Sequence, residues 1–371
     1  MASTPGHPPF PPDPPVIRPS AGALGRSWKW LRYVLGLGVA GLAVWAVTGK
    51  SDELSGASQY LLHLRWEWAV VAAVAEALSY MSFAAMQRRL LGAGNVAIPM
   101  ASMTGITVAG NAIQNSLPAG VVLSAAYSYR QYRRWGADEV LAAWVVVAMA
   151  GVTLVSLAAL AAIGLAMAAS TGSALDLVGA IVGVTVVAAV VVAAWAKRTF
   201  LIAHAVRLVR LSQRFLHRPA GDAHEVVAGA IERMSRVAPS KRQWAWATCF
   251  AMGNWLADLA CLTISFLAVG AGVPWDGLLL AYTAAQLATN LPITPGGLGV
   301  VEGSLTVALV AFGGGQASTV AAVLVYRVLN YWLMLPVGWG AWAVIALKGR
   351  RHAVKASAEP LAAAVPEGGA A

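Results

Sequence analysis

The stretch from Asn290 to Glu302, N-L-P-I-T-P-G-G-L-G-V-V-E, places polar and helix-breaking residues inside an otherwise apolar segment. Backbone amides of glycines next to a helix start favour anions, because their N–H dipoles are aligned. We expect phosphate to be the anion. The residues assigned to this binding tip are Asn290, Thr294, Pro295, Gly296, Gly297 and Gly299. Alternatively, the glycines serve only a tight turn and close helix packing.

Glu302 and Arg327 are charged residues within apolar segments of the second half of the chain. A charge in a membrane helix costs about 2.5 to 3.5 kcal/mol on insertion scales, so each needs a partner. We expect either an ion pair between them or an Arg327 that holds a lipid phosphate while Glu302 orients it. Asn330, three residues after Arg327, is expected on the same helical face as part of this site. A purely structural ion pair is the alternative.

Glu76 and Asp258 are carboxylates in apolar segments that precede two interrupted segments, 98–126 and 277–313 respectively. Asn254 lies one turn before Asp258, and Tyr80 lies one turn after Glu76. An ionisable residue within the membrane is a functional candidate, so both acids are predicted to form a proton or ion site, as in proton or ion coupling. They could instead cap the backbone of the broken helices.

Metal and nucleotide chemistry are not expected from this sequence. Cys249 and Cys261 lie twelve residues apart in one predicted helix, more than three turns, so they cannot pair. No histidine falls within a predicted span, and no C-x-x-C spacing occurs, so we expect no metal and no other cofactor. The chain has no G-x-x-x-x-G-K-[ST] loop for ATP and no D-x-D cluster. We therefore expect no catalytic residues and no enzyme.

The elements that must position these residues are membrane helices. Of the 371 residues, 58% are hydrophobic and 11% are charged, with a mean hydropathy of +0.66, whereas soluble domains carry roughly 25% charged residues. Apolar runs of spanning length, about 20 residues, predict an all-α polytopic membrane protein. The six predicted full spans lie near 31–48, 67–86, 140–168, 175–196, 243–270 and 317–346.

The basic segment 197–242 carries ten Lys or Arg against three acids. A nucleic-acid surface needs base-stacking or base-reading residues among the charges, and Trp244 and Trp246 belong to the next predicted membrane helix. A cytoplasmic loop that follows the positive-inside rule is therefore favoured. Arg207, Arg210, Arg214 and Arg218 recur at helical spacing, which also fits an amphipathic helix on anionic headgroups. Ordinary loop charge explains them nearly as well.

Two shorter, interrupted segments, 98–126 and 277–313, are predicted to be re-entrant helical hairpins. Basic residues flank 98–126 on both sides, so we favour a segment that enters and leaves on the cytoplasmic face, turning near Asn115 to Pro118. The 277–313 hairpin then enters from the outer face. A kinked single span is the alternative for 98–126. Asn115 and Arg130 are assigned to the substrate site, with Tyr127, Tyr129, Arg133 and Arg134 near the inner mouth of the first hairpin.

The two hairpins, each preceded and followed by a span, form an inverted-topology repeat, and such repeats place the substrate near the midplane of the membrane. The predicted organisation is a disordered, proline-rich cytoplasmic leader 1–27, one transmembrane domain 28–348, and a disordered cytoplasmic tail 349–371. Within the domain the first repeat covers about 67–168 and the second about 243–346. Both termini are predicted to be cytoplasmic in a multi-pass protein of the cell membrane.

The motif N-L-P-I-T-P-G-G-L-G-V-V-E-G, supported by Y-R-x-x-N-Y-W at 326–332, resembles the lysylphosphatidylglycerol synthase transmembrane-region family. The resemblance covers roughly 30–346. It departs after Pro118, where many relatives have a Gly-Glu pair and this chain has A-G-V-V-L-S. In the aminoacylating members of the family, aminoacyl transfer belongs to a soluble domain, for which we expect no room after the last span.

The resemblance implies a flippase-like lipid transporter that moves a phospholipid or a lipid-linked glycan between leaflets. The alternative is a non-catalytic accessory subunit or an integral membrane transferase in lipid aminoacylation or glycosylation. Expected partners are that lipid, anionic headgroups at the basic segment, and a second copy of the chain or a separate lipid-modifying enzyme. No nucleic acid is expected.

Overall fold

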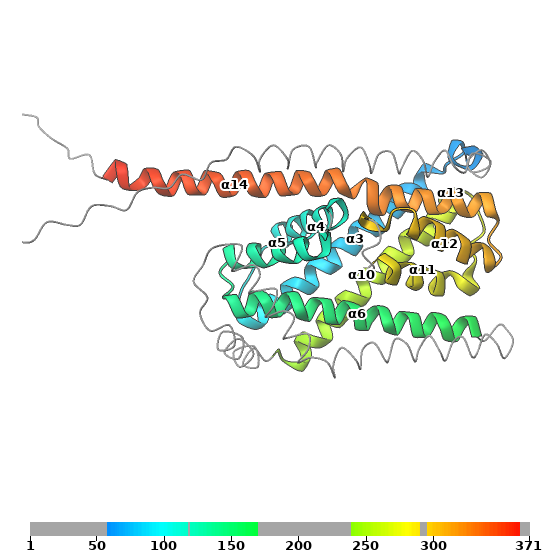
Figure 1. Cartoon of the computed structure of the whole chain (residues 1–371), viewed down its shortest axis with the longest axis horizontal. Helices are drawn as coiled ribbons and strands as arrows, with labels where there is room; N and C mark the ends of the chain where they lie inside the picture. Colours follow the sequence, from blue (N-terminus) through cyan, green and yellow to red (C-terminus); the bar gives the residue numbers. More distant parts are fainter. Residues whose placement is uncertain (1–57, 118, 170–238, 290–294, 364–371) are drawn as a thin grey trace, which may run out of the picture. The chain divides into compact units, whose positions relative to one another are not determined.

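The computed structural model describes residues 58–117, 119–169, 239–289 and 295–363. Within these ranges the regular elements are all helices, as the composition predicts (Figure 1). They are α3 (Trp66–Leu91), η1 (Gly92–Gly94), α4 (Met100–Ser116), α5 (Gly120–Arg134), α6 (Glu139–Ala169), α10 (Lys241–Ala268), α11 (Trp275–Thr289), η2 (Pro295–Gly297), α12 (Val300–Ala311), α13 (Gln316–Arg327), η3 (Val328–Trp332) and α14 (Met334–Ala363).

Four helices of the described part are long and apolar enough to cross a membrane: Trp66–Gly94, Glu139–Ala168, Lys241–Ala268 and Gln316–Lys348. They correspond to four of the six predicted spans. The predicted spans 31–48 and 175–196, the leader 1–27 and nearly all of the basic segment 197–242 lie outside the described residues. The full count of six spans therefore remains a prediction.

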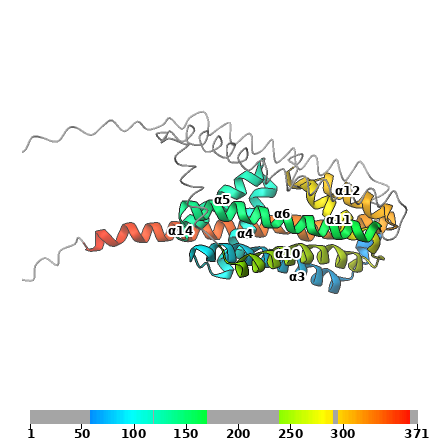
Figure 2. The same cartoon turned by 90° about the horizontal axis from the view of Figure 1, so that it is seen from below.

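Helices α3 and α10 lie side by side in both views (Figures 1 and 2) and pack extensively. Small residues allow the close contact: Ala72 and Ala75 of α3 are buried in one cluster with Cys261 and Leu262 of α10. That cluster extends into α11, α12 and α13, whereas a second cluster joins α3 and the start of α10 to α4, α5 and α6. The α3–α10 pair is thus shared by both hydrophobic cores.

The first interrupted segment forms two short helices, α4 and α5, of 17 and 15 residues, which pack against each other. The break falls at the predicted place, because Leu117 precedes a proline and has extended φ and ψ. Ala119 then adopts a left-handed conformation, with φ of 56°. Helix α5 continues to Arg134, eight residues beyond the predicted boundary at 126.

A buried polar chain fastens this pair of helices to α3. The Gln87 amide nitrogen donates to the Thr107 hydroxyl at 3.0 Å, and the Tyr132 hydroxyl donates to the Gln87 amide oxygen at 2.7 Å. All three side chains are buried. Each group finds a partner within the protein, as the dry interior requires.

The second interrupted segment consists of α11 with 15 residues, the 3-10 turn η2, and α12 with 12 residues. Helices α11 and α12 also pack against each other. Gly296, Gly297 and Gly299 have φ of 63°, 68° and 80°, a region that side chains disfavour. The glycines of the motif therefore build the turn that starts α12. Residues 290–294 lie outside the described part.

The last span is interrupted by a π-helical turn, η3, between α13 and α14. The amide of Leu333 donates to the carbonyl of Val328 at 2.8 Å, five residues back. Beyond the turn, α14 approaches α4 so closely that a Cβ on Gly338 would collide with the Val108 backbone. Helix α14 continues to Ala363, so the expected disordered tail from 349 is wrong over 349–363. Its Ala, Lys, Arg and Glu residues are good helix formers.

Candidate functional site

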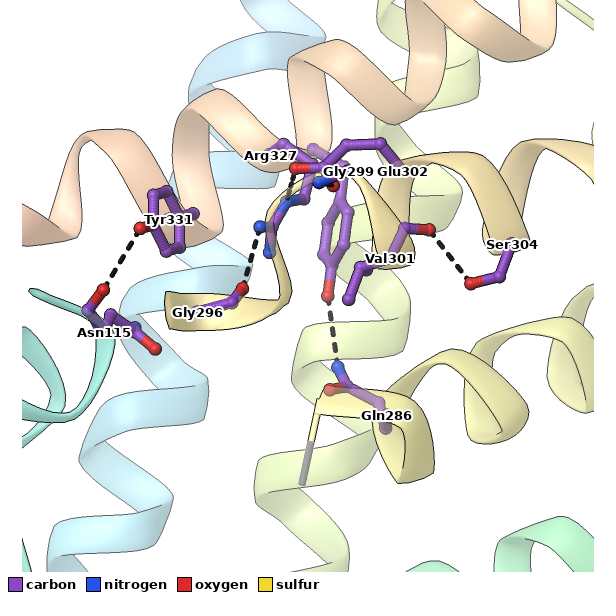
Figure 3. Close-up of polar contacts among 10 residues, drawn as sticks. Asn115, Gln286, Gly296, Gly299, Val301, Glu302, Ser304, Arg327 and Tyr331 are labelled. Atoms are coloured by element: carbon purple, nitrogen blue, oxygen red, sulfur yellow. Dashed lines mark hydrogen bonds and ion pairs between the residues drawn. The ribbon is translucent and has the colours of Figure 1, made fainter. Parts of the chain in front are cut away.

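Glu302 and Arg327 form an ion pair in which Arg327 Nε lies 2.7 Å from Glu302 Oε1 (Figure 3). The arginine side chain is 4% exposed and the glutamate 23%. The second carboxylate oxygen, Oε2, accepts a hydrogen bond from the Gly299 amide at 2.7 Å. Glu302 therefore satisfies an amide at the start of α12 and neutralises a buried guanidinium at the same time.

The guanidinium of Arg327 has two further contacts. Its Nη2 donates to the Gly296 carbonyl at 3.1 Å, and its Cζ lies 4.6 Å from the centre of the Tyr331 ring, a cation–π distance. The Tyr331 ring is also what a Cβ on Gly296 would strike. Glycine at 296 thus allows the turn η2 to lie directly against Arg327 and Tyr331.

Tyr331 connects this tip to the first interrupted segment. Its hydroxyl donates to the Asn115 carbonyl at 3.2 Å, as Figure 3 shows. Close by, Trp339 Nε1 donates to the Ser116 hydroxyl at 3.1 Å, and α4 also contacts η2. The breaks of both interrupted segments therefore meet at the π-helical turn of the last span. Tyr331 was not among the residues assigned from sequence, although it stands in the Y-R-x-x-N-Y-W motif.

The glycine tip differs from the expected bare anion site, because an internal carboxylate already occupies it. The Gly299 amide bonds Glu302, and the Gly296 carbonyl bonds Arg327. Asn290 and Thr294 lie outside the described residues, as does the side chain of Pro295. Gly297 is buried, with a Cβ position against the side chain of Val301.

Asp258 lies at the centre of a second polar group, where it accepts hydrogen bonds from four side chains. Tyr282 Oη and Gln286 Nε2 bond Oδ2 at 2.7 and 2.6 Å. Tyr326 Oη and Asn330 Nδ2 bond Oδ1 at 3.0 and 2.9 Å. Tyr282, Gln286 and Tyr326 were missed from sequence. The i, i+4 spacing of Tyr282 and Gln286 on an apolar helix was the available signal.

Glu76 joins the same group through Asn330. The Asn330 amide nitrogen donates to Glu76 Oε1 at 3.0 Å as well as to Asp258, and the Tyr80 hydroxyl reaches the Asn330 carbonyl at 3.4 Å. Asn330 was expected beside Arg327, and its side chain bonds Glu76 and Asp258.

The remaining predicted site residues lie elsewhere. Arg130 is exposed on α5, and within the described part no hydrogen bond or ion pair links it to Arg327. Asn254 contacts the Ser79 hydroxyl at 3.1 Å rather than Asp258. Cys249 and Cys261 both lie in α10 and are free. No cluster of metal-ligating residues occurs among the residues that the structure describes.

Two relatives that match part of the chain are membrane proteins. Over 112 residues the chain is 34% identical to a UPF0104 membrane protein of Methanothermobacter thermautotrophicus, which covers 29% of this chain and 32% of the relative. Over 126 residues it is 25% identical to a UPF0104 membrane protein of Pyrococcus horikoshii, covering 34% and 36%. The chain thus matches about a third of the length of each relative.

A much longer match defines the family. Residues 32–338 match the family described as the lysylphosphatidylglycerol synthase TM region. This range contains the two interrupted segments, the Glu302–Arg327 pair and the Asp258 group. The chain therefore belongs to the lysylphosphatidylglycerol synthase TM region family of membrane proteins.

Proposed function

We propose that this protein moves a phosphate-bearing lipid, a phospholipid or a lipid-linked glycan, between the leaflets of the cell membrane. The observation that carries the proposal is the position of Arg327. The Arg327 side chain, 4% exposed, lies in a helix long and apolar enough to span, at the point where the breaks of both interrupted segments meet. An intramembrane cation at the junction of broken helices is typical of a substrate site.

The Glu302 carboxylate occupies the place that we assign to the lipid phosphate. Arginine binds carboxylate and phosphate with the same planar set of donors, so a phosphate can replace Glu302 as the partner of Arg327. Glu302 is more exposed than Arg327, and its second oxygen bonds the Gly299 amide. Glu302 would keep the site neutral until a lipid headgroup arrives.

The proposed transport path uses the inverted repeat. The α4–α5 pair would enter from the cytoplasmic face and the α11–α12 pair from the outer face, with both chain termini in the cytoplasm. Support comes from the short length of all four helices and from the packing of α3 against α10, the spans that precede each pair. Movement of one pair against the other would open the site to each leaflet in turn.

In this proposal the chain itself catalyses no group transfer. A separate enzyme would supply the modified lipid, and the basic segment 197–242 would bind anionic headgroups. The name of the family makes lysylphosphatidylglycerol the first lipid to assay, beside phosphatidylglycerol and a polyprenyl-phosphate-linked sugar.

The test is leaflet-resolved lipid transport in proteoliposomes that contain the full chain. Arg327→Lys keeps the charge but loses the planar donor set. We expect it to slow transport about tenfold or more, equivalent to at least ~1.4 kcal/mol. Glu302→Gln is expected to slow transport as well, because the amide cannot neutralise Arg327.

The chain offers a matched control in its exposed ion pair. Arg133 and Glu139 lie 3.4 Å apart with side chains 39% and 76% exposed, so Glu139→Gln, at a residue outside the proposed substrate site, should leave transport unchanged. Unimpaired transport in both Arg327→Lys and Glu302→Gln would refute the site. A wild-type protein that moves none of the three lipids would favour the accessory-subunit alternative.

A further inference from the structure

Glu76 of α3 and Asp258 of α10 are a pair of buried carboxyl groups, with 1% and 4% of their surface exposed. They come from the two helices that occupy equivalent places before the interrupted segments. One nitrogen, Asn330 Nδ2, lies 3.0 Å from Glu76 Oε1 and 2.9 Å from Asp258 Oδ1. The two oxygens are therefore within about 6 Å, a separation at which like charges disfavour each other.

The hydrogen bonds around the two carboxyl groups are unequal. Asp258 accepts from Tyr282, Gln286, Tyr326 and Asn330, which is a donor set suited to an ionised carboxylate. Within the described part of the chain, Glu76 accepts one hydrogen bond, from Asn330, and its Oε2 is buried without a hydrogen-bond partner. A proton on Glu76 would let this orphaned oxygen donate a hydrogen bond instead of accepting one, beside an Asp258 carboxylate that shares the Asn330 nitrogen with Glu76.

The surroundings do not neutralise a second negative charge. Among the described residues, the titratable groups near the pair are the hydroxyls of Tyr80, Tyr282 and Tyr326, the thiol of Cys261 and the guanidinium of Arg327. Arg327 is already matched by Glu302. Of the other helices packed on α3, α4 contains no titratable residue, and the one charged residue of α6 is Glu139 at its first position.

We infer that Glu76 and Asp258 together bind one proton, and that this proton is the ion to which lipid movement is coupled. The second half of the inference rests on the proposed transport function. Two buried carboxyl groups that share a site hold a proton between them because both cannot ionise. The proton binds to Glu76, and Asp258 remains the carboxylate that accepts its hydrogen bond.

Asn330 supplies the connection to the lipid site. It lies in the π-helical turn η3, which Arg327 precedes directly. The next residue in the turn is Tyr331. Arg327 contacts the second interrupted segment and Tyr331 the first. Release of the proton would leave two carboxylates competing for the Asn330 amide. A resulting shift of η3 would change the contacts of Arg327 and Tyr331 with the two interrupted segments. Single π-helical turns within helices are frequent at functional sites.

The proton itself is tested by infrared titration of the full chain, without any transport. We expect a protonated-carboxyl band at neutral pH that is lost in Glu76→Gln and retained in Glu139→Gln, whose carboxyl group is exposed. Gel filtration checks that both variants are folded. The inference is overturned if the wild type lacks this band, or if the band survives in folded Glu76→Gln.

Coupling is tested in proteoliposomes under a pH difference of about one unit, a tenfold difference in proton activity, with the membrane potential held at zero. With one proton per lipid, the wild type should drive the steady-state leaflet ratio of the lipid towards about tenfold. Glu76→Gln should move lipid without responding to the gradient.

The outcomes separate the two proposals. Lipid movement that ignores the pH gradient, or that follows a sodium gradient instead, overturns the coupling and leaves the transport function standing. A protonated carboxyl band without movement of any tested lipid overturns the transport function, while the proton site remains. A gradient response that persists in Glu76→Gln overturns the assignment of the proton to this pair.

Discussion

The hydroxyl of Tyr331 lies 3.2 Å from the backbone carbonyl oxygen of Asn115, at the end of α4. The ring of the same tyrosine covers the guanidinium of Arg327, which bonds the Gly296 carbonyl in the turn before α12. Tyr331 therefore contacts both interrupted segments, one through its hydroxyl and the other through its ring. This division allows the two contacts to be removed separately.

Tyr331→Phe removes the hydrogen bond to Asn115 and keeps the ring over Arg327. Hydrogen bonds between membrane helices contribute about 0.6 kcal/mol on average and up to about 1.7, so the contact between the segments should weaken without unfolding the protein. Spin labels at the exposed Val121 and Val307 should report a broader distance distribution. Tyr129→Phe, on α5 and outside the site, is the control. An unchanged distribution in Tyr331→Phe would show that the hydroxyl does not hold the segments together.

Arg327→Met should destabilise the protein by about 3 to 5 kcal/mol, because it leaves the Glu302 charge without its partner. The double variant Arg327→Met with Glu302→Gln should recover much of this loss, because no charge is then left unpaired. Denaturant titration in detergent measures the free energy of unfolding of the single and the double variant. The corresponding single and double substitutions of the exposed Arg133–Glu139 pair should give an interaction energy of about 0 to 1 kcal/mol. Equal effects at the two pairs would contradict the burial argument.

Gly338→Leu should destabilise the protein by at least about 1 to 3 kcal/mol, the usual cost of overpacking a close contact. A Cβ at this position meets the backbone of Val108 and the side chain of Ala112, so α14 would have to move away from α4. Gly340→Leu is the matched control, since open space surrounds its Cβ position. A lower melting temperature for Gly338→Leu alone is the expected result, and similar melting temperatures for the two variants would contradict the close α4–α14 packing.

Residues whose chemistry is unusual in a membrane were predictable from the sequence. Glu302 and Arg327 each needed a partner, and the structure joins them at 2.7 Å. The helix break near Pro118 was equally predictable, because a proline disfavours helical backbone in the residue before it. Both predictions use local rules that hold whatever the tertiary arrangement.

The partners of Asp258 were not predictable in the same way. Tyr282, Gln286 and Tyr326 come from α11 and α13, and they lie 24, 28 and 68 residues from Asp258, so only the tertiary arrangement brings them to it. The π-helical turn was also hidden, since its hydrogen bonds shift by one residue without a sequence signature. As a result, Asn330 was placed with Arg327, whereas it bonds the two carboxyl groups.

Single cysteines at positions 135 and 316 test whether the interrupted segments enter from opposite faces. Trp135 follows α5 and is 42% exposed, and Gln316 is exposed at the start of α13. In a background with Cys249→Ser and Cys261→Ala, an impermeant maleimide applied to right-side-out cells should label Gln316→Cys directly. Trp135→Cys should react only after permeabilisation, as should Lys348→Cys, an exposed position expected in the cytoplasm.

The two labels distinguish a re-entrant pair from a single kinked span. The basic residues Arg133 and Arg134 end α5, and the positive-inside rule keeps them in the cytoplasm only if α4 and α5 enter and leave by the same face. If Trp135→Cys is labelled from outside while Lys348→Cys is protected, residues 98–126 cross the membrane once. The inverted repeat, and with it the opposed entry of the two segments at Tyr331, would then be wrong.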